Sequence, residues 1–319
     1  MDLVGGLKRR AQSVPWRIAS DLAQRPMIHT LRTRRYDASV ALHRPALPRL
    51  TPAQDAILAE VDQRGVSQRD IATLGIPGSG AMLLSAADLA QAWADRLRAR
   101  GREGIDFLYV PADEIARHPE IYRFGLDAGL LDLVEAYIGL PIAYDGVTLQ
   151  YTVADGRPVS TRKWHRDRED RRMVKMAIYL TDVDAAGGPF QLLPILDPAS
   201  YETGPRDMFY LREADEVEQD GCVLGTRPIS CEGPAGTAVF ADTARFFHRG
   251  KPATGNDRAA LFFSYFARIP ERPFFCYRSG LSYRQIAAMT DDLSPRQRAA
   301  ALWRQTLPLP WRLIPPSAV

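Results

Sequence analysis

The sequence changes character near residue 142, from helical spacing to short β-rich runs. The β-rich part limits the possible folds most strongly. From about residue 142 to residue 275 the chain consists of short runs rich in β-branched and aromatic residues, at 143–153, 174–181, 237–241 and 259–267. Turn-forming sequences separate these runs, among them Asp155-Gly156 and Gly187-Gly188-Pro189. Short strands with turns at such intervals are typical of a β-sandwich or barrel.

The region before residue 142 has the spacing of helices. Thr51-Pro52 places an N-cap residue before a proline at the first helical position, and Gly65 ends the apolar pattern that follows. Residues 86–98 repeat this spacing, and a third helical segment runs over residues 119–139. The sequence therefore predicts a mainly β protein with helical additions (α+β).

We divide the chain into three regions. Residues 1–50 form a basic N-terminal extension, with a short helix expected around residues 16–23. Residues 51–275 form the domain that holds the strands and the helices before them. Residues 276–319 form a C-terminal helical tail, in which Ser294-Pro295 predicts a helix over residues 294–305.

The charge of the N-terminal extension allows two interpretations. Residues 1–50 carry ten Lys and Arg against three acidic residues, whereas the net charge of the whole chain is only +3. A basic arm of this kind can contact a phosphate-bearing partner or an anionic membrane surface. The interpretation that we favour is a solvated extension or one that contacts another subunit.

Composition excludes several classes of protein. The apolar fraction of 46% and the charged fraction of 25% are ordinary for a soluble globular protein. No run approaches 18 apolar residues, so we expect no transmembrane segment, and the N-terminal sequence lacks the order of a signal peptide. The cysteines are odd in number and form no CxxC pair (Cys222, Cys231 and Cys276), which argues against disulfides and thiolate zinc and favours the cytoplasm. No nucleic-acid-binding motif is present.

Three residues in the β-rich region have the pattern of a metal site. His165 and Asp167 form an H-x-D motif, and residues i and i+2 of an extended strand point to the same face. The third ligand must come from elsewhere, and His248 is the only later histidine, at the end of an apolar run that predicts a strand rim. Two histidines and one carboxylate on one side of a metal suit Fe(II), because the opposite coordination positions stay open.

Arg258 follows His248 by ten residues and opens an apolar run. The residues between them predict a hairpin, whose returning strand would bring Arg258 back into the interior near the metal. An interior arginine is costly unless it meets an anion, and its planar guanidinium matches a carboxylate. Each feature is common by itself, as a buried histidine or a surface ion pair; together they indicate a metal site with a carboxylate-bearing ligand.

Two segments carry a resemblance to a known family. They are WHRDREDRRMVKMAIYLTDVDAAGGPFQLLP at 164–194 and GPAGTAVFADTARFFHRGKPATGNDRAALFFSYF at 233–266. Over about residues 50–275 the chain resembles the phytanoyl-CoA dioxygenase-like family of Fe(II)/2-oxoglutarate oxygenases. The resemblance implies a double-stranded β-helix (a jelly roll, cupin-like) buttressed by the N-terminal helices. In one departure, residues 193–197 read LPILD where relatives commonly have Pro-Gly-Ser-His.

The resemblance also implies roles for particular residues. His165, Asp167 and His248 would bind iron, and Arg258 would pair with the remote carboxylate of the cosubstrate 2-oxoglutarate. Gln150 and Thr237 match positions near the cosubstrate. The implied reaction uses O₂ to hydroxylate a small-molecule substrate and releases succinate and CO₂. Iron halogenases of related design lack the carboxylate that Asp167 supplies, so its presence favours hydroxylation over halogenation. Desaturation, ring formation and epimerisation remain open outcomes at the same iron centre.

Other functions remain open at this point. The same three ligands could hold another metal in a cupin-like protein that is not an oxygenase, such as an isomerase or a metal-dependent binding protein. A barrel without activity that serves as a binding module is a third class. Arginines around the first motif admit an anionic substrate, although we favour ion pairs with nearby acids; they are Arg157, Arg162, Arg166, Arg168, Arg171 and Arg172.

Overall fold

The computed structural model describes residues 14–16, 18–19, 22, 25–101, 104–105, 107–194, 227–277 and 279–314. Half of the helix expected around residues 16–23 lies outside the described residues. So do Cys222 and residues 195–197, where the family pattern departs.

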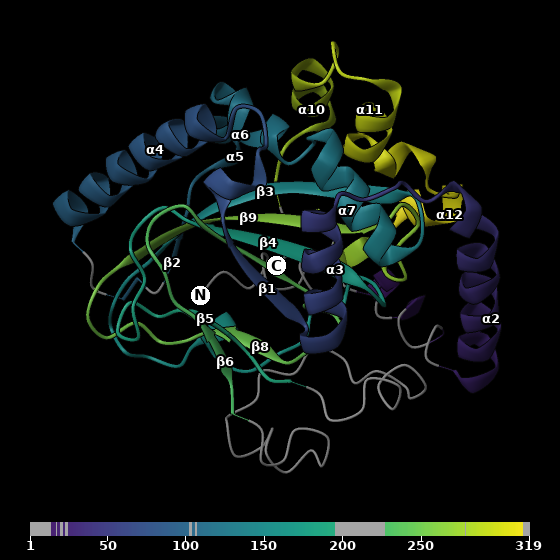
Figure 1. Ribbon diagram of the computed structural model, residues 1–319, viewed down its shortest axis with the longest axis horizontal. Coiled ribbons are helices and arrows are strands. Elements are labelled where there is room, and N and C mark those ends of the chain that lie inside the picture. Colours follow the sequence, from purple (N-terminus) through teal and green to yellow (C-terminus); the bar gives the residue numbers. More distant parts are fainter. Residues whose placement is uncertain are drawn as a thin grey trace.

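The described strands form two antiparallel sheets (Figure 1). The larger sheet has the order β1-β7-β4-β9-β3-β2. Its strands are β1 (Val66–Asp70), β2 (Phe107–Tyr109), β3 (Ile142–Thr152), β4 (Met173–Tyr179), β7 (Thr237–Ala241) and β9 (Arg258–Ala267). The smaller sheet has the order β6-β5-β8, with β5 (Phe190–Leu192), β6 (Ile229–Cys231) and β8 (His248–Gly250).

Helices cover the face of the larger sheet that is turned away from the smaller sheet, and α2 stands at one side (Figure 1). None of the described helices is long and apolar enough to cross a membrane. The α-helices are α2 (Pro26–His43), α3 (Pro52–Arg64), α4 (Ser79–Arg100), α5 (Ala112–Arg117), α6 (Pro119–Phe124), α7 (Ala128–Ile138), α10 (Tyr283–Met289), α11 (Pro295–Ala301) and α12 (Leu309–Leu313). Short 3₁₀ turns are η1 (Arg44–Ala46), η2 (Ile71–Leu74), η3 (Ser160–Arg162), η4 (Pro273–Phe275) and η5 (Trp303–Thr306).

The alternation of side chains along β4 shows how the sheet separates two environments. Val174, Met176 and Ile178 belong to the main core beneath the helices. Ala177 and Tyr179 belong to a second core between the two sheets. Because successive side chains of a strand point to opposite faces, each central strand presents one row to the helices and one row to the space between the sheets.

The expected mixture of helices with an antiparallel β region is confirmed, and the four predicted strand runs correspond to β3, β4, β7 and β9. Two short strands, β1 and β2, lie in the region that was expected to be helical. The predicted helix over residues 119–139 is divided into α6 and α7. Asp127 caps the start of α7, where its carboxylate accepts hydrogen bonds from the backbone N–H groups of Gly129 and Leu130.

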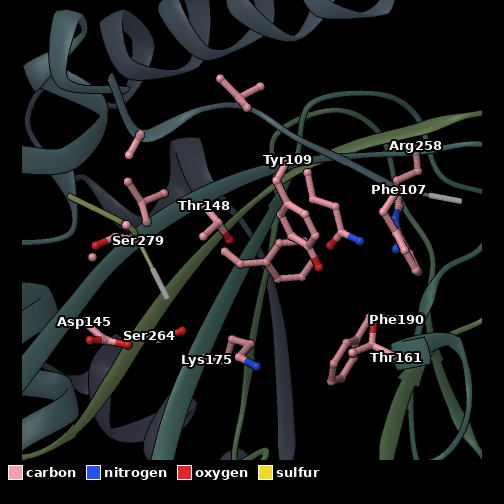
Figure 2. A pocket seen from close by; sticks show the side chains of 18 of the residues that line it. Phe107, Tyr109, Asp145, Thr148, Thr161, Lys175, Phe190, Arg258, Ser264 and Ser279 are labelled. Atoms are coloured by element: carbon pink, nitrogen blue, oxygen red, sulfur yellow. The ribbon is translucent and has the colours of Figure 1, made fainter. Parts of the chain in front are cut away.

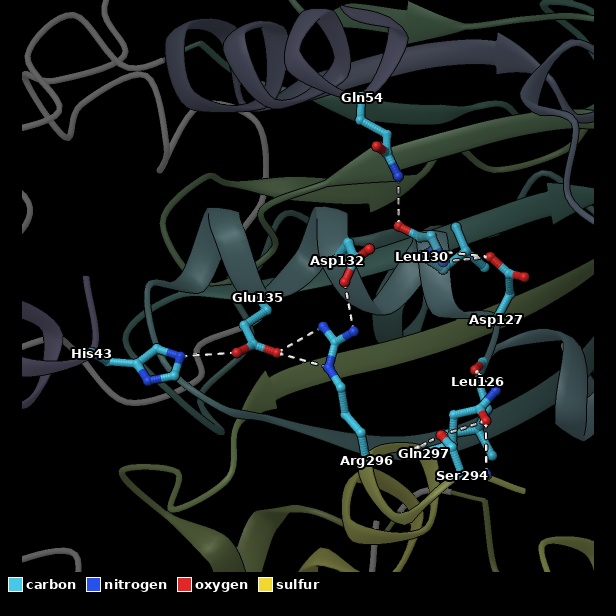
Figure 3. A network of polar contacts seen from close by, with 11 residues as sticks. His43, Gln54, Leu126, Asp127, Leu130, Asp132, Glu135, Ser294, Arg296 and Gln297 are labelled. Carbon is cyan, nitrogen blue, oxygen red and sulfur yellow. Dashed lines mark hydrogen bonds and ion pairs between the residues drawn. The ribbon is translucent and has the colours of Figure 1, made fainter. Parts of the chain in front are cut away.

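The N-terminal helix, the central region and the C-terminal tail meet at one carboxylate (Figure 3). Glu135 on α7 is 9% exposed. It lies 2.9 Å from His43 Nε2 of α2 and 2.8 Å from Arg296 Nη2 of α11. Arg296 also donates to Asp132, one turn earlier on α7. These contacts hold α2 and α11 against α7.

Candidate metal centre and adjoining cavity

The two candidate histidine ligands are adjacent across an isolated antiparallel bridge. The N–H group of His165 donates to the carbonyl of His248 at 3.1 Å, and the reverse bond is 2.9 Å. The Nδ1 atoms lie 2.9 Å from the Lys163 carbonyl and 3.2 Å from the Phe246 carbonyl, respectively. A proton on Nδ1 that is donated to a carbonyl leaves Nε2 with a lone pair, and this arrangement is common for histidines that bind metals.

Asp167 completes the group. Its backbone N–H donates to the Thr243 carbonyl at 2.7 Å, and its side chain is fully buried. Its Oδ2 atom lies 3.8 Å from His248 Nε2. One potential ligand atom from each of the three residues lies within 4.8 Å of the other two. Metal–nitrogen and metal–oxygen bonds are about 2.1 Å long, so small side-chain rotations would bring all three atoms to one ion.

The electrostatic environment favours a neutral imidazole at His248. Burial, followed by the neighbouring His165, lowers the pKa of His248 well below its ordinary value. A neutral imidazole is the form that binds a metal. The buried Asp167 carboxylate supplies the negative charge, so the donor set fits a divalent cation.

A cavity of about 400 Å³ adjoins this group, with His165 and His248 in its wall. Figure 2 shows Arg258 and Phe107 on one side of the cavity, and Asp145, Ser264 and Ser279 on the other. Aromatic side chains also line the cavity, including Tyr109, Phe190 and Phe262. Apolar walls with a few polar groups are typical of a site that binds a small molecule.

Arg258 lies in the wall of the same cavity and is 4% exposed. Its Nη1 donates to the Gly188 carbonyl, and its Nε has no hydrogen-bond partner among the described residues. Burial lowers the pKa of the guanidinium. A Cβ atom at Gly250 would lie 2.9 Å from Arg258 Nη2, so the glycine leaves the space that the guanidinium fills. A buried cation with an unused donor is suited to a carboxylate.

The prediction of a hairpin between His248 and Arg258 was wrong. β8 pairs with β5 in the smaller sheet, whereas β9 pairs with β3 and β4 in the larger sheet. The chain therefore crosses from one sheet to the other. His248 begins β8 instead of ending the apolar strand β7, and the H-x-D segment makes single bridging contacts instead of a regular strand.

The two other predicted cosubstrate residues have different positions. Gln150 lines the cavity, in register with Tyr109 on β2 and Ala260 on β9. Thr237 begins β7 opposite Asp70, its backbone N–H donates to the Pro234 carbonyl at 3.0 Å, and it is absent from the described cavity wall. Its role at the cosubstrate stays a prediction without structural support.

Lys175 was not identified from the sequence. It lines the cavity, and its Nζ atom lies 2.5 Å from Asp167 Oδ2. The signal was available, because Lys175 is the one charged residue in VKMAIYL and has the same strand phase as Ala177 and Tyr179. Asp145, Ser264 and Ser279 also line the cavity and were missed, because they come together only through strand pairing and the C-terminal tail.

The arginines around the first motif mainly contact neighbouring side chains. Arg157 and Arg162 pair with Asp155, Arg171 with Glu271 and Arg172 with Asp62. Arg166 and Arg168 lie over the rings of Phe247 and Phe275. In the described cavity wall Arg162 is the one member of this group, and it already has an acidic partner. These contacts favour ion pairing over an anionic-substrate role for the cluster.

No protein-family model and no curated protein matches this sequence. Several solved structures are similar at low sequence identity. The α-ketoglutarate-dependent carbocyclase SnoK of nogalamycin biosynthesis is 15% identical, with a TM-score of 0.49 over 70% of this chain and 88% of that one. EctD from S. alaskensis with bound Fe is 17% identical, with a TM-score of 0.46 over 69% and 77%. HygX from Streptomyces hygroscopicus with nickel and 2-oxoglutarate is 16% identical, with a TM-score of 0.44 over 69% and 88%. Similarities of this size leave the function to be argued from the site itself.

Proposed function

We propose that this protein is a non-haem Fe(II)- and 2-oxoglutarate-dependent dioxygenase that oxidises a small-molecule substrate with O₂. His165, Asp167 and His248 would hold the iron. Arg258 would hold the remote carboxylate of 2-oxoglutarate, and Gln150 would contact the cosubstrate from β3. The products would be oxidised substrate, succinate and CO₂.

One observation carries this proposal: a 2-His-1-carboxylate group and a buried arginine with an unused donor adjoin the same cavity. A metal site alone would fit many proteins. The arginine adds a second anchor that suits the free end of a ligand bound to the metal at its other end. Bound iron would supply O₂ activation beside the substrate. The aromatic walls would exclude water from the reacting atoms.

Finer assignments belong to the same proposal. The proposed architecture is the double-stranded β-helix of phytanoyl-CoA dioxygenase-like oxygenases, and the presence of two antiparallel sheets supports it. Retention of Asp167 favours hydroxylation as the outcome. A cytoplasmic location remains the prediction made from cysteine content. The proposed role of the N-terminal extension is packing against the body of the protein, since His43 of α2 contacts Glu135.

The test is an anaerobic titration of metal-free protein with Fe(II) and 2-oxoglutarate, followed by the visible charge-transfer band of the chelated cosubstrate. The wild type should develop the band, His165→Ala should not, and Arg258→Ala should need more 2-oxoglutarate. Arg172→Ala is the matched control, because Arg172 pairs with Asp62 outside the described cavity wall. Bound iron without a band would favour the cupin-like alternative, and failure to bind any metal would favour a binding module.

A further inference from the structure

The contact between Lys175 and Asp167 places a cation beside the proposed metal. The Lys175 side chain is 12% exposed and that of Asp167 is fully buried, and the Nζ–Oδ2 distance is 2.5 Å. Asp167 is the one hydrogen-bond partner of Nζ in the described part of the chain. Figure 2 shows the ammonium group at the cavity, between the side of Arg258 and the side of Ser264.

The position of Lys175 follows from strand register. On β4 it is opposite Ala241 of β7 and Ser264 of β9, with its side chain on the inner face of the larger sheet. A lysine in the centre of a sheet is costly unless it meets a negative charge. Asp167 supplies that charge, and its backbone N–H donates to the carbonyl of Thr243, which follows β7.

A buried carboxylate equally needs a positive partner. Removing one member of a buried ion pair is strongly destabilising, because the other charge stays in a poorly solvated place. In the metal-bound protein a divalent cation at the triad would satisfy Asp167. Without metal, the Lys175 ammonium is a cation in direct contact with this oxygen.

We propose that Lys175 is the counter-ion of Asp167 in the metal-free protein and competes with the metal for that carboxylate. This inference rests on the proposed function. Lys175 is then a positioning residue: its contact orients the carboxylate toward the two histidines before metal arrives. The same contact weakens metal binding, because the incoming dication must displace or repel the ammonium. Lys175 therefore stabilises the metal-free state more than the metal-bound state.

The experiment is a double-mutant cycle of Lys175→Met and Asp167→Asn, measured by thermal melting of chelator-treated protein. Lys175→Met should lower the melting temperature of the metal-free wild type by several degrees and change that of Asp167→Asn much less. Lys175→Arg should stay near wild type, because it retains the cation. Lys251→Met is the matched control, since Lys251 donates to the Ala185 carbonyl and lies outside the described cavity wall.

Calorimetric titration with Mn(II) supplies the second readout. Lys175→Met should bind Mn(II) at least roughly tenfold more tightly than wild type, and saturating Mn(II) should restore most of its lost melting temperature. If Lys175→Met does not fold without metal, Lys175→Gln replaces it in the same titration.

Two results would overturn the inference. One is an equal loss of melting temperature from Lys175→Met in the wild-type and Asp167→Asn backgrounds. The other is an unchanged affinity for Mn(II), which would leave the proposed metal site intact. Failure of the wild type itself to bind Mn(II) is a different outcome, because it overturns the proposed function.

Discussion

At the scale of single residues, the space left by Gly250 determines where the Arg258 guanidinium lies. A methyl group there would come within 2.9 Å of Nη2, which is closer than ordinary contacts between non-bonded atoms permit. The glycine belongs to β8 of the smaller sheet, whereas the arginine begins β9 of the larger sheet. The cavity thus depends on a missing side chain in one sheet and a long side chain from the other.

Gly250→Ala should therefore weaken 2-oxoglutarate binding without weakening metal binding. The displaced guanidinium would lose charge-assisted hydrogen bonds worth about 1.5–3 kcal/mol, and the dissociation constant should rise about tenfold or more. Anaerobic titration of the Mn(II)-loaded protein with 2-oxoglutarate measures this directly. Gly80→Ala is the control, because a Cβ there meets nothing within 4 Å. Equal 2-oxoglutarate affinities for Gly250→Ala and wild type would contradict the role of Arg258.

Two cysteines should be chemically inert in the folded protein. Burial raises the pKa of the Cys231 thiol to about 12, and burial also raises the pKa of Cys276 well above its ordinary value. Because the thiolate is the reactive form, neither side chain should be alkylated by iodoacetamide at pH 8 until the protein unfolds. Peptide mapping by mass spectrometry with and without denaturant tests this, and rapid native labelling of Cys231 would show that the space between the sheets is open.

The sequence indicated the three candidate ligands and Arg258 because the H-x-D motif, the later histidine and the arginine ten residues beyond it occur together in one β-rich region. It did not identify Lys175, whose role depends on its contact with Asp167, a residue outside β4. The alternation in VKMAIYL predicts that the lysine side chain lies on the inner face of the strand, but it does not predict which residue pairs with it. Thr237 illustrates the opposite limit, since its family position implied a cosubstrate role and the structure places it outside the described cavity wall.

At the scale of elements, an irregularity in β3 shapes one side of the cavity. The register of β3 against β9 shifts between Tyr144 and Val147, and Gly146 has a φ of 91°. A Cβ atom at Gly146 would lie 2.7 Å from Ser279 Cβ. The bulge therefore lets the start of the C-terminal tail approach the strand, where Asp145 accepts a hydrogen bond from the Tyr277 N–H at 2.8 Å.

Gly146→Ala should destabilise the protein by about 3 kcal/mol, since it combines a strained backbone conformation with overpacking. Gly156→Ala is the matched control. It also has a positive φ, of 69°, but its Cβ would meet only Thr254 Cγ2, at 3.5 Å, and it should cost about 1 kcal/mol. Urea denaturation of both variants measures the difference. Equal losses would mean that Ser279 moves away without cost.

Strands were predictable where their composition was distinctive. The predicted run over residues 237–241 coincides with β7, and Thr51 forms the capping box that its sequence indicates for α3. The short edge strands β1 and β2 were missed because their pairing with β7 and β3 joins distant parts of the chain. The hairpin after His248 was predicted wrongly, because chain distance does not reveal that β8 and β9 belong to different sheets.

At the scale of the whole molecule, the three regions distinguished in the sequence are in close contact. His43, Glu135 and Arg296 come from the N-terminal, central and C-terminal regions and form one ion-paired group (Figure 3). Trp303 of the tail packs edge-on against Phe266 of β9, with ring centroids 5.0 Å apart. The sequence gives little indication of these contacts, because each depends on residues more than 30 positions apart.

Glu135→Gln should destabilise the whole protein by about 2–3 kcal/mol, because it leaves Arg296 with Asp132 alone and removes the charged partner of His43. Urea denaturation should show one shifted transition by both fluorescence and circular dichroism. Glu120→Gln, at a carboxylate that is 37% exposed beside His118, should change stability by less than about 0.5 kcal/mol. Separate transitions for the two probes would indicate that the tail unfolds independently.

The chain crossing between β8 and β9 places the two proposed anchors of 2-oxoglutarate in different sheets. His248 begins β8 of the smaller sheet and Arg258 begins β9 of the larger sheet. Under the proposed function, a dicarboxylate held by the metal at one end and by Arg258 at the other would therefore connect the two sheets. The distance between the two sheets would then determine which length of dicarboxylate can bind at both ends. Under the same proposal, diacids one carbon shorter or longer than 2-oxoglutarate should bind more weakly than 2-oxoglutarate itself.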